Sequence, residues 1–88
     1  MSIAICFGRA VKQLRGEHRY SQEVLADRAS LNRTYLGEIE RGVAVPSLAT
    51  IAKIASALNL SASELVARSE RQQELIIPKE KSLQHAVG

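Results

Sequence analysis

Residues 22–41, with the sequence QEVLADRASLNRTYLGEIER, constrain the fold more than any other part of the chain. Apolar residues recur in this segment at helical spacing, in two groups that a short turn separates. Leu25, Ala26 and Ala29 share one face of a first helix, and Leu36 and Ile39 share one face of a second. The small side chain of Ala26 suits a close crossing of the two helices. We therefore predict two short helices that pack against each other at a fixed angle.

The second helix of this pair is predicted to begin after Asn32, because an asparagine side chain can accept a hydrogen bond from a free N–H group of the first turn. The face turned away from the core is then formed by Arg33, Thr34, Gly37, Glu38 and Arg41. Such a face can both donate hydrogen bonds to base edges in a DNA major groove and accept them. The pair therefore predicts a helix-turn-helix that reads DNA.

Helical patterns also flank this pair. In residues 3–16 the apolar positions have the spacing of a helix with one buried face, and Ser21 is placed to cap the next helix. A further helix is expected after Ser47, and Asn59 stands where a left-handed residue ends a helix. Ser61 and Glu64 form a capping box that opens the last helix. The sequence therefore predicts an all-α fold of five helices.

The last helix is expected to carry Leu65 and Val66 inside, and its pattern weakens beyond Arg68. We place the DNA-binding domain at residues 1–69 and a C-terminal extension, partly flexible, at residues 70–88. A short apolar island in the extension consists of Leu75, Ile76 and Ile77. Proline cannot continue a helix, so Pro78 is expected to stop any helix that reaches it.

Composition agrees with this interpretation and excludes several classes of protein. The 88 residues include 12 Lys and Arg against 9 Asp and Glu, a net charge of +3, which permits nucleic-acid binding. The one cysteine, Cys6, cannot form a disulfide within the chain, and no apolar run reaches the roughly 20 residues of a membrane span. We therefore expect a cytoplasmic protein that does not enter a membrane.

The sequence also lacks the motifs of a catalytic or metal site. It has no nucleophile elbow, no glycine-rich phosphate loop and no zinc signature. His18 and His85 have no partners at metal-ligand spacing. We therefore expect neither an enzyme, nor a bound metal, nor a cofactor.

Three segments, in order, carry a resemblance to a known family: FGRAVKQLR, YSQEVLADRASLNRTYLGEIERG and PSLATIAKIASALNLSASELV. Residues 7–66 resemble the Xre/Cro family of phage-repressor-like DNA-binding domains, which includes restriction-modification controller proteins and several antitoxins. The resemblance implies a compact five-helix lambda-repressor-like domain. It also implies a transcriptional regulator that binds double-stranded DNA sequence-specifically, as a homodimer on a palindromic operator.

The resemblance further implies roles for individual residues. The base-reading positions of the family are occupied by Arg33, Thr34 and Glu38, and its phosphate-contacting positions by Gln22, Asn32, Tyr35 and Arg41. Arg15 and Glu40 match a charged pair that ties the first helix to the recognition helix. For the dimer contact we favour the last helix with the apolar island, namely Leu65, Val66, Leu75, Ile76 and Ile77.

The sequence leaves several alternatives open. Gln22 and Asn32 also fit a plain helix-start role, and Glu38 fits either base reading or an ion pair with Arg33 or Arg41. Ser30 stands where the family usually has glycine, which predicts a strained positive φ. Gly37 is expected to let the helix approach DNA closely. The alternative function is an antitoxin or controller protein that regulates its own operon and binds a protein partner through its tail.

Overall fold

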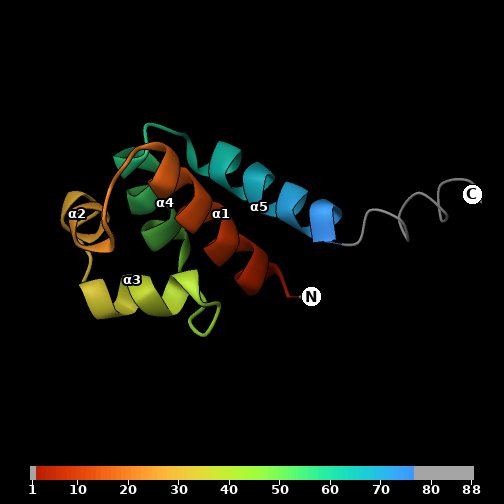
Figure 1. Ribbon diagram of the computed structural model, residues 1–88, viewed down its shortest axis with the longest axis horizontal. Coiled ribbons are helices and arrows are strands. Elements are labelled where there is room, and N and C mark those ends of the chain that lie inside the picture. Colours follow the sequence, from red (N-terminus) through yellow and green to blue (C-terminus); the bar gives the residue numbers. More distant parts are fainter. Residues whose placement is uncertain (1, 77–88) are drawn as a thin grey trace, which may run out of the picture.

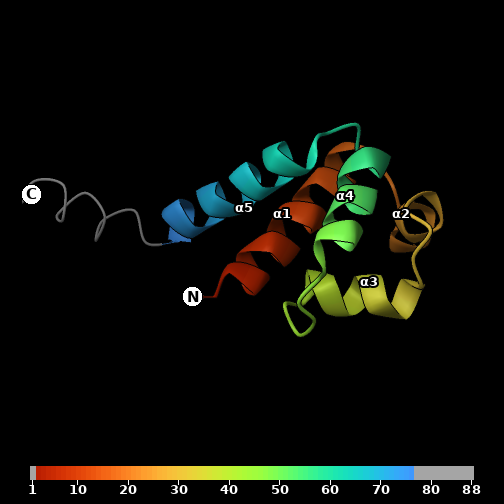
Figure 2. The same cartoon turned by 180° about the vertical axis from the view of Figure 1, so that it is seen from behind.

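The computed structural model describes residues 2–76, which fold into five α-helices without a strand. The helices are α1 (Ile3–Glu17), α2 (Gln22–Arg28), α3 (Arg33–Glu40), α4 (Leu48–Ala57) and α5 (Ala62–Ile76). In Figure 1, α1 and α5 run side by side, and α3 lies along the opposite edge of the molecule. The reverse view in Figure 2 gives the same arrangement, with α4 in front of α1. The predicted all-α fold of five helices is therefore confirmed for the described residues.

Short polar side chains fix where the helices begin. The side chain at each of four N-caps accepts a hydrogen bond from a backbone N–H three residues later, and these caps are Ser2, Ser21, Asn32 and Ser47. At α5 the bonds are reciprocal: Ser61 Oγ accepts from the Glu64 N–H at 3.1 Å, and Glu64 Oε1 accepts from the Ser61 N–H at 2.9 Å. These two bonds form the predicted capping box.

Left-handed residues end two of the helical segments where the sequence predicts them. Ser30, after α2, has φ of 55°, and Asn59, after α4, has φ of 60°. The turn between α2 and α3 is closed by backbone hydrogen bonds from Ser30 N to Asp27 O at 3.1 Å and from Leu31 N to Ala26 O at 2.8 Å. Ser30 therefore holds the conformation that glycine adopts without strain.

The core is formed by buried side chains from all five helices. Its largest fully buried side chains are Leu25, Leu36, Ile39, Ile54, Leu58 and Leu65. Leu65 is 0% exposed, so the prediction that it offers an exposed dimer contact is wrong for the described chain. Val66 is 37% exposed, so the prediction that it lies inside is also wrong. Neighbouring residues on a helix point about 100° apart, and of these two only Leu65 lies in the core.

α5 extends past Arg68, where the apolar pattern weakens, and ends at Ile76. Ser69 is 1% exposed, and its hydroxyl donates to the Leu65 carbonyl at 3.0 Å. One turn later, Gln72 Nε2 donates to Gln13 Oε1 on α1. The segment contacts α1 without the apolar spacing that would predict a buried face, and its buried hydroxyl is satisfied within the helix. The predicted boundary between residues 69 and 70 therefore lies within α5.

The apolar island straddles the end of the described chain. Leu75 and Ile76 form the last residues of α5, whereas Ile77, His85 and the rest of residues 77–88 lie outside the described residues. None of the described helices is long and apolar enough to span a lipid bilayer.

Candidate nucleic-acid interface

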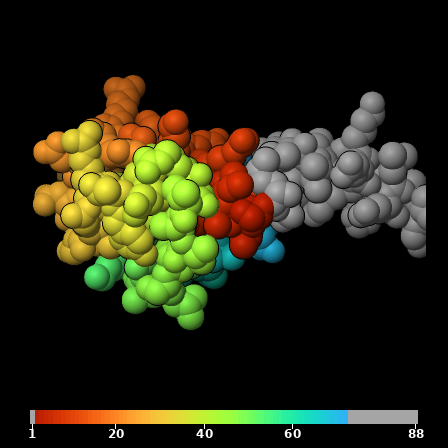
Figure 3. Space-filling view, turned by 90° about the horizontal axis from the view of Figure 1, so that it is seen from below, coloured from red at the N-terminus to blue at the C-terminus, as the bar shows by residue number. Residues whose placement is uncertain are grey.

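α3 presents its polar face at the surface, beside α2. Arg33, Thr34 and Arg41 are exposed, and Tyr35 and Glu38 are half-buried. Figure 3 shows α3 and the loop that follows it spread across one face of the molecule, next to α2. The other side of α3 buries Leu36 and Ile39 in the core, so its outer face has a fixed orientation.

A buried carboxylate anchors the C-terminal end of α3. Glu40 Oε2 accepts from Arg15 Nε at 2.7 Å and Glu40 Oε1 accepts from Arg15 Nη2 at 3.0 Å, so the guanidinium and the carboxylate form a bidentate pair. Arg15 Nη1 donates to the Tyr20 carbonyl at 3.1 Å. The hydrogen bond with Glu40 raises the pKa of Arg15. The structure thus brings together the two residues that the sequence pairs, and it ties α3 to α1.

Gln22 joins this network, which sequence reasoning missed. Its Nε2 donates to Glu40 Oε1 at 2.9 Å and connects the first turn of α2 to the last turn of α3. One N–H of the amide is occupied in this way, and the second remains for another acceptor. The separation of 18 residues between Gln22 and Glu40 gives no local pattern in the sequence that would indicate the contact.

Gly37 does not lie on the outward face as predicted, because two side chains cover it. A Cβ at this position would lie 3.3 Å from Arg41 Nη1 and 3.7 Å from Gln22 Oε1. The missing side chain of Gly37 therefore makes room for Arg41 and Gln22 on α3. The prediction that it lets DNA approach the helix directly is corrected by this packing.

Two further predicted residues have partners inside the motif. Asn32 Oδ1 accepts from the Tyr35 N–H at 3.2 Å, the N-cap role that the sequence leaves open for it. Arg33 Nη1 lies 3.7 Å from Glu23 Oε2 on α2. In the described part of the chain, Glu38 forms no ion pair with Arg33 or Arg41, which leaves its carboxylate available to a ligand.

The loop after α3 is apolar at its tip. Val43 is 71% exposed and Val45 is 80% exposed, and Leu48, the first residue of α4, is 83% exposed. At the base of the loop, Gly42 has φ of 77°, and a Cβ there would overlap Ile5 of α1. This loop extends the exposed face of α3 without adding a charge.

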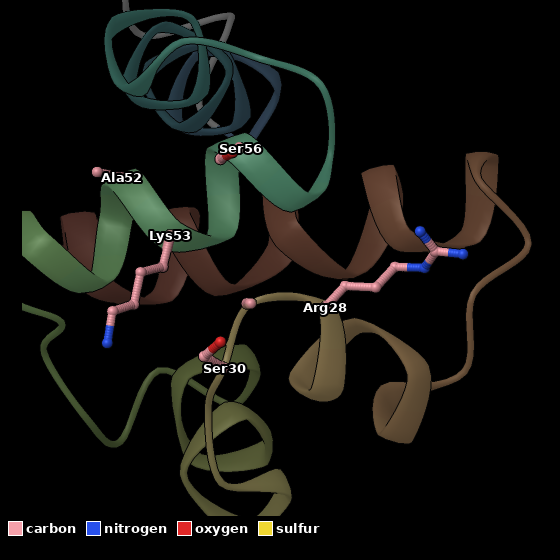
Figure 4. Close-up of a pocket in the computed structure, with 6 residues that line it drawn as sticks. Arg28, Ser30, Ala52, Lys53 and Ser56 are labelled. Atoms are coloured by element: carbon pink, nitrogen blue, oxygen red, sulfur yellow. The ribbon is translucent and has the colours of Figure 1, made fainter.

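A hollow on another part of the surface lies between the end of α2 and α4. Arg28, Ser30, Lys53 and Ser56 are among its lining residues. In Figure 4, Arg28 and Lys53 point in different directions from it. The Arg28 guanidinium lies 4.8 Å from the centre of the Tyr20 ring. The polar groups do not converge on one point. Within residues 2–76, no three metal-ligating side chains cluster.

Residues 11–65 match the helix-turn-helix family HTH_3. The chain belongs to this family. Control protein C.BamHI of Bacillus amyloliquefaciens is 41% identical over 66 residues, which cover 74% of this chain and 82% of that protein. The immunity repressor protein of Bacillus phage phi105 is 36% identical over 80 residues, which cover 86% of this chain and 56% of the repressor. The chain therefore spans a little over half the length of that repressor.

Solved structures of this family have the same fold. The restriction-modification controller protein C.AhdI from Aeromonas hydrophila is 40% identical with a TM-score of 0.69, and the match covers 70% of this chain and 94% of that one. The structure of SinR, the master regulator for biofilm formation, was solved in complex with DNA. SinR is 34% identical with a TM-score of 0.65, and the match covers 68% of this chain and 97% of that one. The chain is a helix-turn-helix DNA-binding regulator of transcription, as its sequence predicts.

Proposed function

We propose that this helix-turn-helix regulator binds a palindromic operator as a homodimer and reads each half-site with α3. The observation that carries the proposal is the fixed outward face of α3. The helix is buried through Leu36 and Ile39 and anchored through Glu40, while Arg33 and Thr34 stay exposed at its N-terminal end. A helix that enters a major groove reads bases mainly with such N-terminal residues.

In this proposal, base reading is assigned to Arg33, Thr34 and Glu38. An arginine can bond guanine O6 and N7 together, and a carboxylate can accept from a cytosine amino group. Phosphate contacts are assigned to Gln22, Asn32, Tyr35 and Arg41. The free N–H of Gln22, at the positive end of α2, supports such a contact.

We infer the homodimer from the small number of base pairs that one recognition helix can contact. One recognition helix contacts only a few base pairs, so two copies about 34–36 Å apart are needed to read a site of useful length. We assign the dimer contact to the exposed side of α5, with Val66 and the apolar island formed by Leu75, Ile76 and Ile77. Val66 is 37% exposed on a helix whose opposite side is in the core.

The dimer contact is tested by Val66→Glu, with Val24→Glu as the matched control on α2, where Val24 is 41% exposed. Sedimentation at tens of micromolar should give a dimer for the native chain and the control, and a monomer for Val66→Glu. A native chain that sediments as a monomer and still binds a full operator tightly contradicts the dimer.

A second candidate is more specific: a restriction-modification controller protein that regulates its own operon. The identity of 41% to C.BamHI and of 40% to C.AhdI favours it. An antitoxin, whose tail binds a protein partner while the helices regulate the operon, is the alternative. Binding of the purified protein to the DNA upstream of its own gene supports either, and the product of the adjoining gene distinguishes them. In each case we propose a cytoplasmic regulator without catalytic activity.

Base reading is tested by selecting bound sites from random DNA. Arg33→Ala should cost about 1–3 kcal/mol at the selected site and relax the preference at one base in each half-site. Arg41→Ala should weaken all sequences alike and lower the slope of log affinity against log salt by about one unit, because one phosphate contact is lost. Unchanged base preference in the Arg33 variant contradicts the proposal.

A further inference from the structure

We propose that Glu23 is a positioning residue that holds Arg33 for base recognition and thereby raises the sequence specificity of the regulator. The inference rests on the proposed function, in which Arg33 reads a base. Its basis is the ion pair that joins the two helices of the motif, with Arg33 Nη1 3.7 Å from Glu23 Oε2. Glu23 lies in the first turn of α2, and Arg33 is the first residue of α3.

This ion pair contributes little to the stability of the free protein. The side chain of Arg33 is 66% exposed and that of Glu23 is 79% exposed, so water screens their attraction. Their separation of 3.7 Å is also too long for a hydrogen bond. A contribution to the stability of the fold therefore does not account for this ion pair, and its effect is expected in the complex with DNA.

The attraction becomes stronger when DNA covers the pair. An interface with a major groove excludes water from the first turn of α3, and a lower local dielectric raises the energy of the ion pair. Arginine has five N–H donors, so a guanidinium that turns Nη1 toward Glu23 keeps its other donors for guanine O6 and N7. Glu23 restricts the many rotamers of Arg33, and the base contact then costs less entropy.

The same carboxylate weakens binding that does not involve the base. Glu23 adds a negative charge beside a helix end that we assign to phosphate contact, and DNA of any sequence repels that charge. At the operator, the contact between Arg33 and its guanine offsets this repulsion. On DNA without that guanine, the repulsion is not offset. Both effects increase the ratio of specific to non-specific affinity.

The test uses Glu23→Gln, which keeps the size of the side chain and removes its charge. Asp27→Asn is the matched control, because Asp27 is exposed on the same helix and makes no ion pair in the described part of the chain. Affinities of the full chain are measured for the selected operator, for the operator with the guanine replaced, and for unrelated duplex DNA. Arg33→Ala and the double variant Glu23→Gln/Arg33→Ala complete the set.

Glu23→Gln should lower the discrimination for guanine by about three- to tenfold, the size of a coupling between neighbouring residues, and should raise affinity for unrelated DNA. Asp27→Asn should leave the discrimination unchanged. With Ala at position 33, the change at Glu23 should no longer alter base preference.

Three results overturn the inference. Equal discrimination in the Glu23 and Asp27 variants shows that only bulk charge matters. A base preference that still depends on Glu23 when Arg33 is absent shows that Glu23 contacts a base itself. An Arg33→Ala variant with native base preference refutes base reading by Arg33, and with it the role of Glu23; only this third result also contradicts the proposed function.

Discussion

The pair formed by Arg15 and Glu40 gives the sharpest prediction about stability. The Glu40 side chain is 3% exposed and accepts two hydrogen bonds from Arg15 and one from Gln22. Arg15→Met would leave the carboxylate buried with only the amide of Gln22. Breaking a buried pair from one side costs about 3–5 kcal/mol, and we expect a loss of about 3–4 kcal/mol in the free energy of unfolding.

Removing the other partner of the pair should lower the free energy of unfolding by less. Glu40→Leu leaves Arg15 without its partner, but the Arg15 side chain is 17% exposed and keeps the Tyr20 carbonyl as an acceptor. Partial rehydration should limit the loss to about 2–3 kcal/mol. The double variant Arg15→Met/Glu40→Leu removes both charges, and its total loss should also be about 2–3 kcal/mol. The coupling between the two positions is then about 3 kcal/mol or more.

Urea unfolding followed by far-UV circular dichroism measures these losses. If a single variant does not fold, Arg15→Lys tests the bidentate contact instead, because it keeps the charge and loses the bidentate geometry, at a cost of about 1–2 kcal/mol. Single losses that simply add in the double variant would refute the reasoning, since the carboxylate and the guanidinium would then not interact in the folded protein.

Three other expectations follow from single positions. Gly8→Ala should cost about 1–3 kcal/mol in urea unfolding, because the new Cβ would lie 2.6 Å from the Glu40 carbonyl oxygen; full stability would mean that α1 can move away from α3. Ser30→Gly should raise the melting temperature by relieving its positive φ of 55°, and more than Asn59→Gly does, since asparagine tolerates this conformation; the opposite order would refute the strain. The bonds with Ser61 lower the pKa of Glu64 from 4.5, so the stabilisation by Glu64 is present above pH 4.5 and is lost as pH falls through the lowered value. The difference in melting temperature between the native chain and Glu64→Gln should therefore be largest near neutral pH and disappear in acid.

The helix boundaries could be predicted because local chemistry sets them. A serine or asparagine cap bonds to an N–H only three residues away, so Ser21, Asn32, Ser47 and Ser61 can be recognised from the sequence. Asn59 is a favourable residue for a left-handed turn for a similarly local reason.

Contacts between distant residues were harder to predict. Gln22 bonds to Glu40 across 18 positions, and Gly37 is covered by side chains from two places in the chain. α5 continues through a polar segment, in which the buried hydroxyl of Ser69 bonds to the Leu65 carbonyl of the same helix. Hydrophobic periodicity detects none of these features, since it records apolar spacing and not the partner of a polar group.

The family resemblance also implies one contact between distant residues. The pairing of Arg15 with Glu40 follows from matching positions and not from any spacing, and the structure has the bonds that the match implies. Leu65 and Val66 show the limit of such matching, because one residue of rotation on a helix decides whether a side chain is in the core or at the surface.

The packing of α1 against α5 has a consequence for synthesis on the ribosome. The apolar face of α1, which includes Cys6, Val11 and Leu14, leaves the ribosome long before the residues of α5 that cover it. Contacts this far apart in sequence form late, because the loop between them must close first. The nascent chain therefore carries an apolar helix face that α5 cannot cover until Leu65 and Ser69 emerge, and apolar surface exposed in this way favours aggregation.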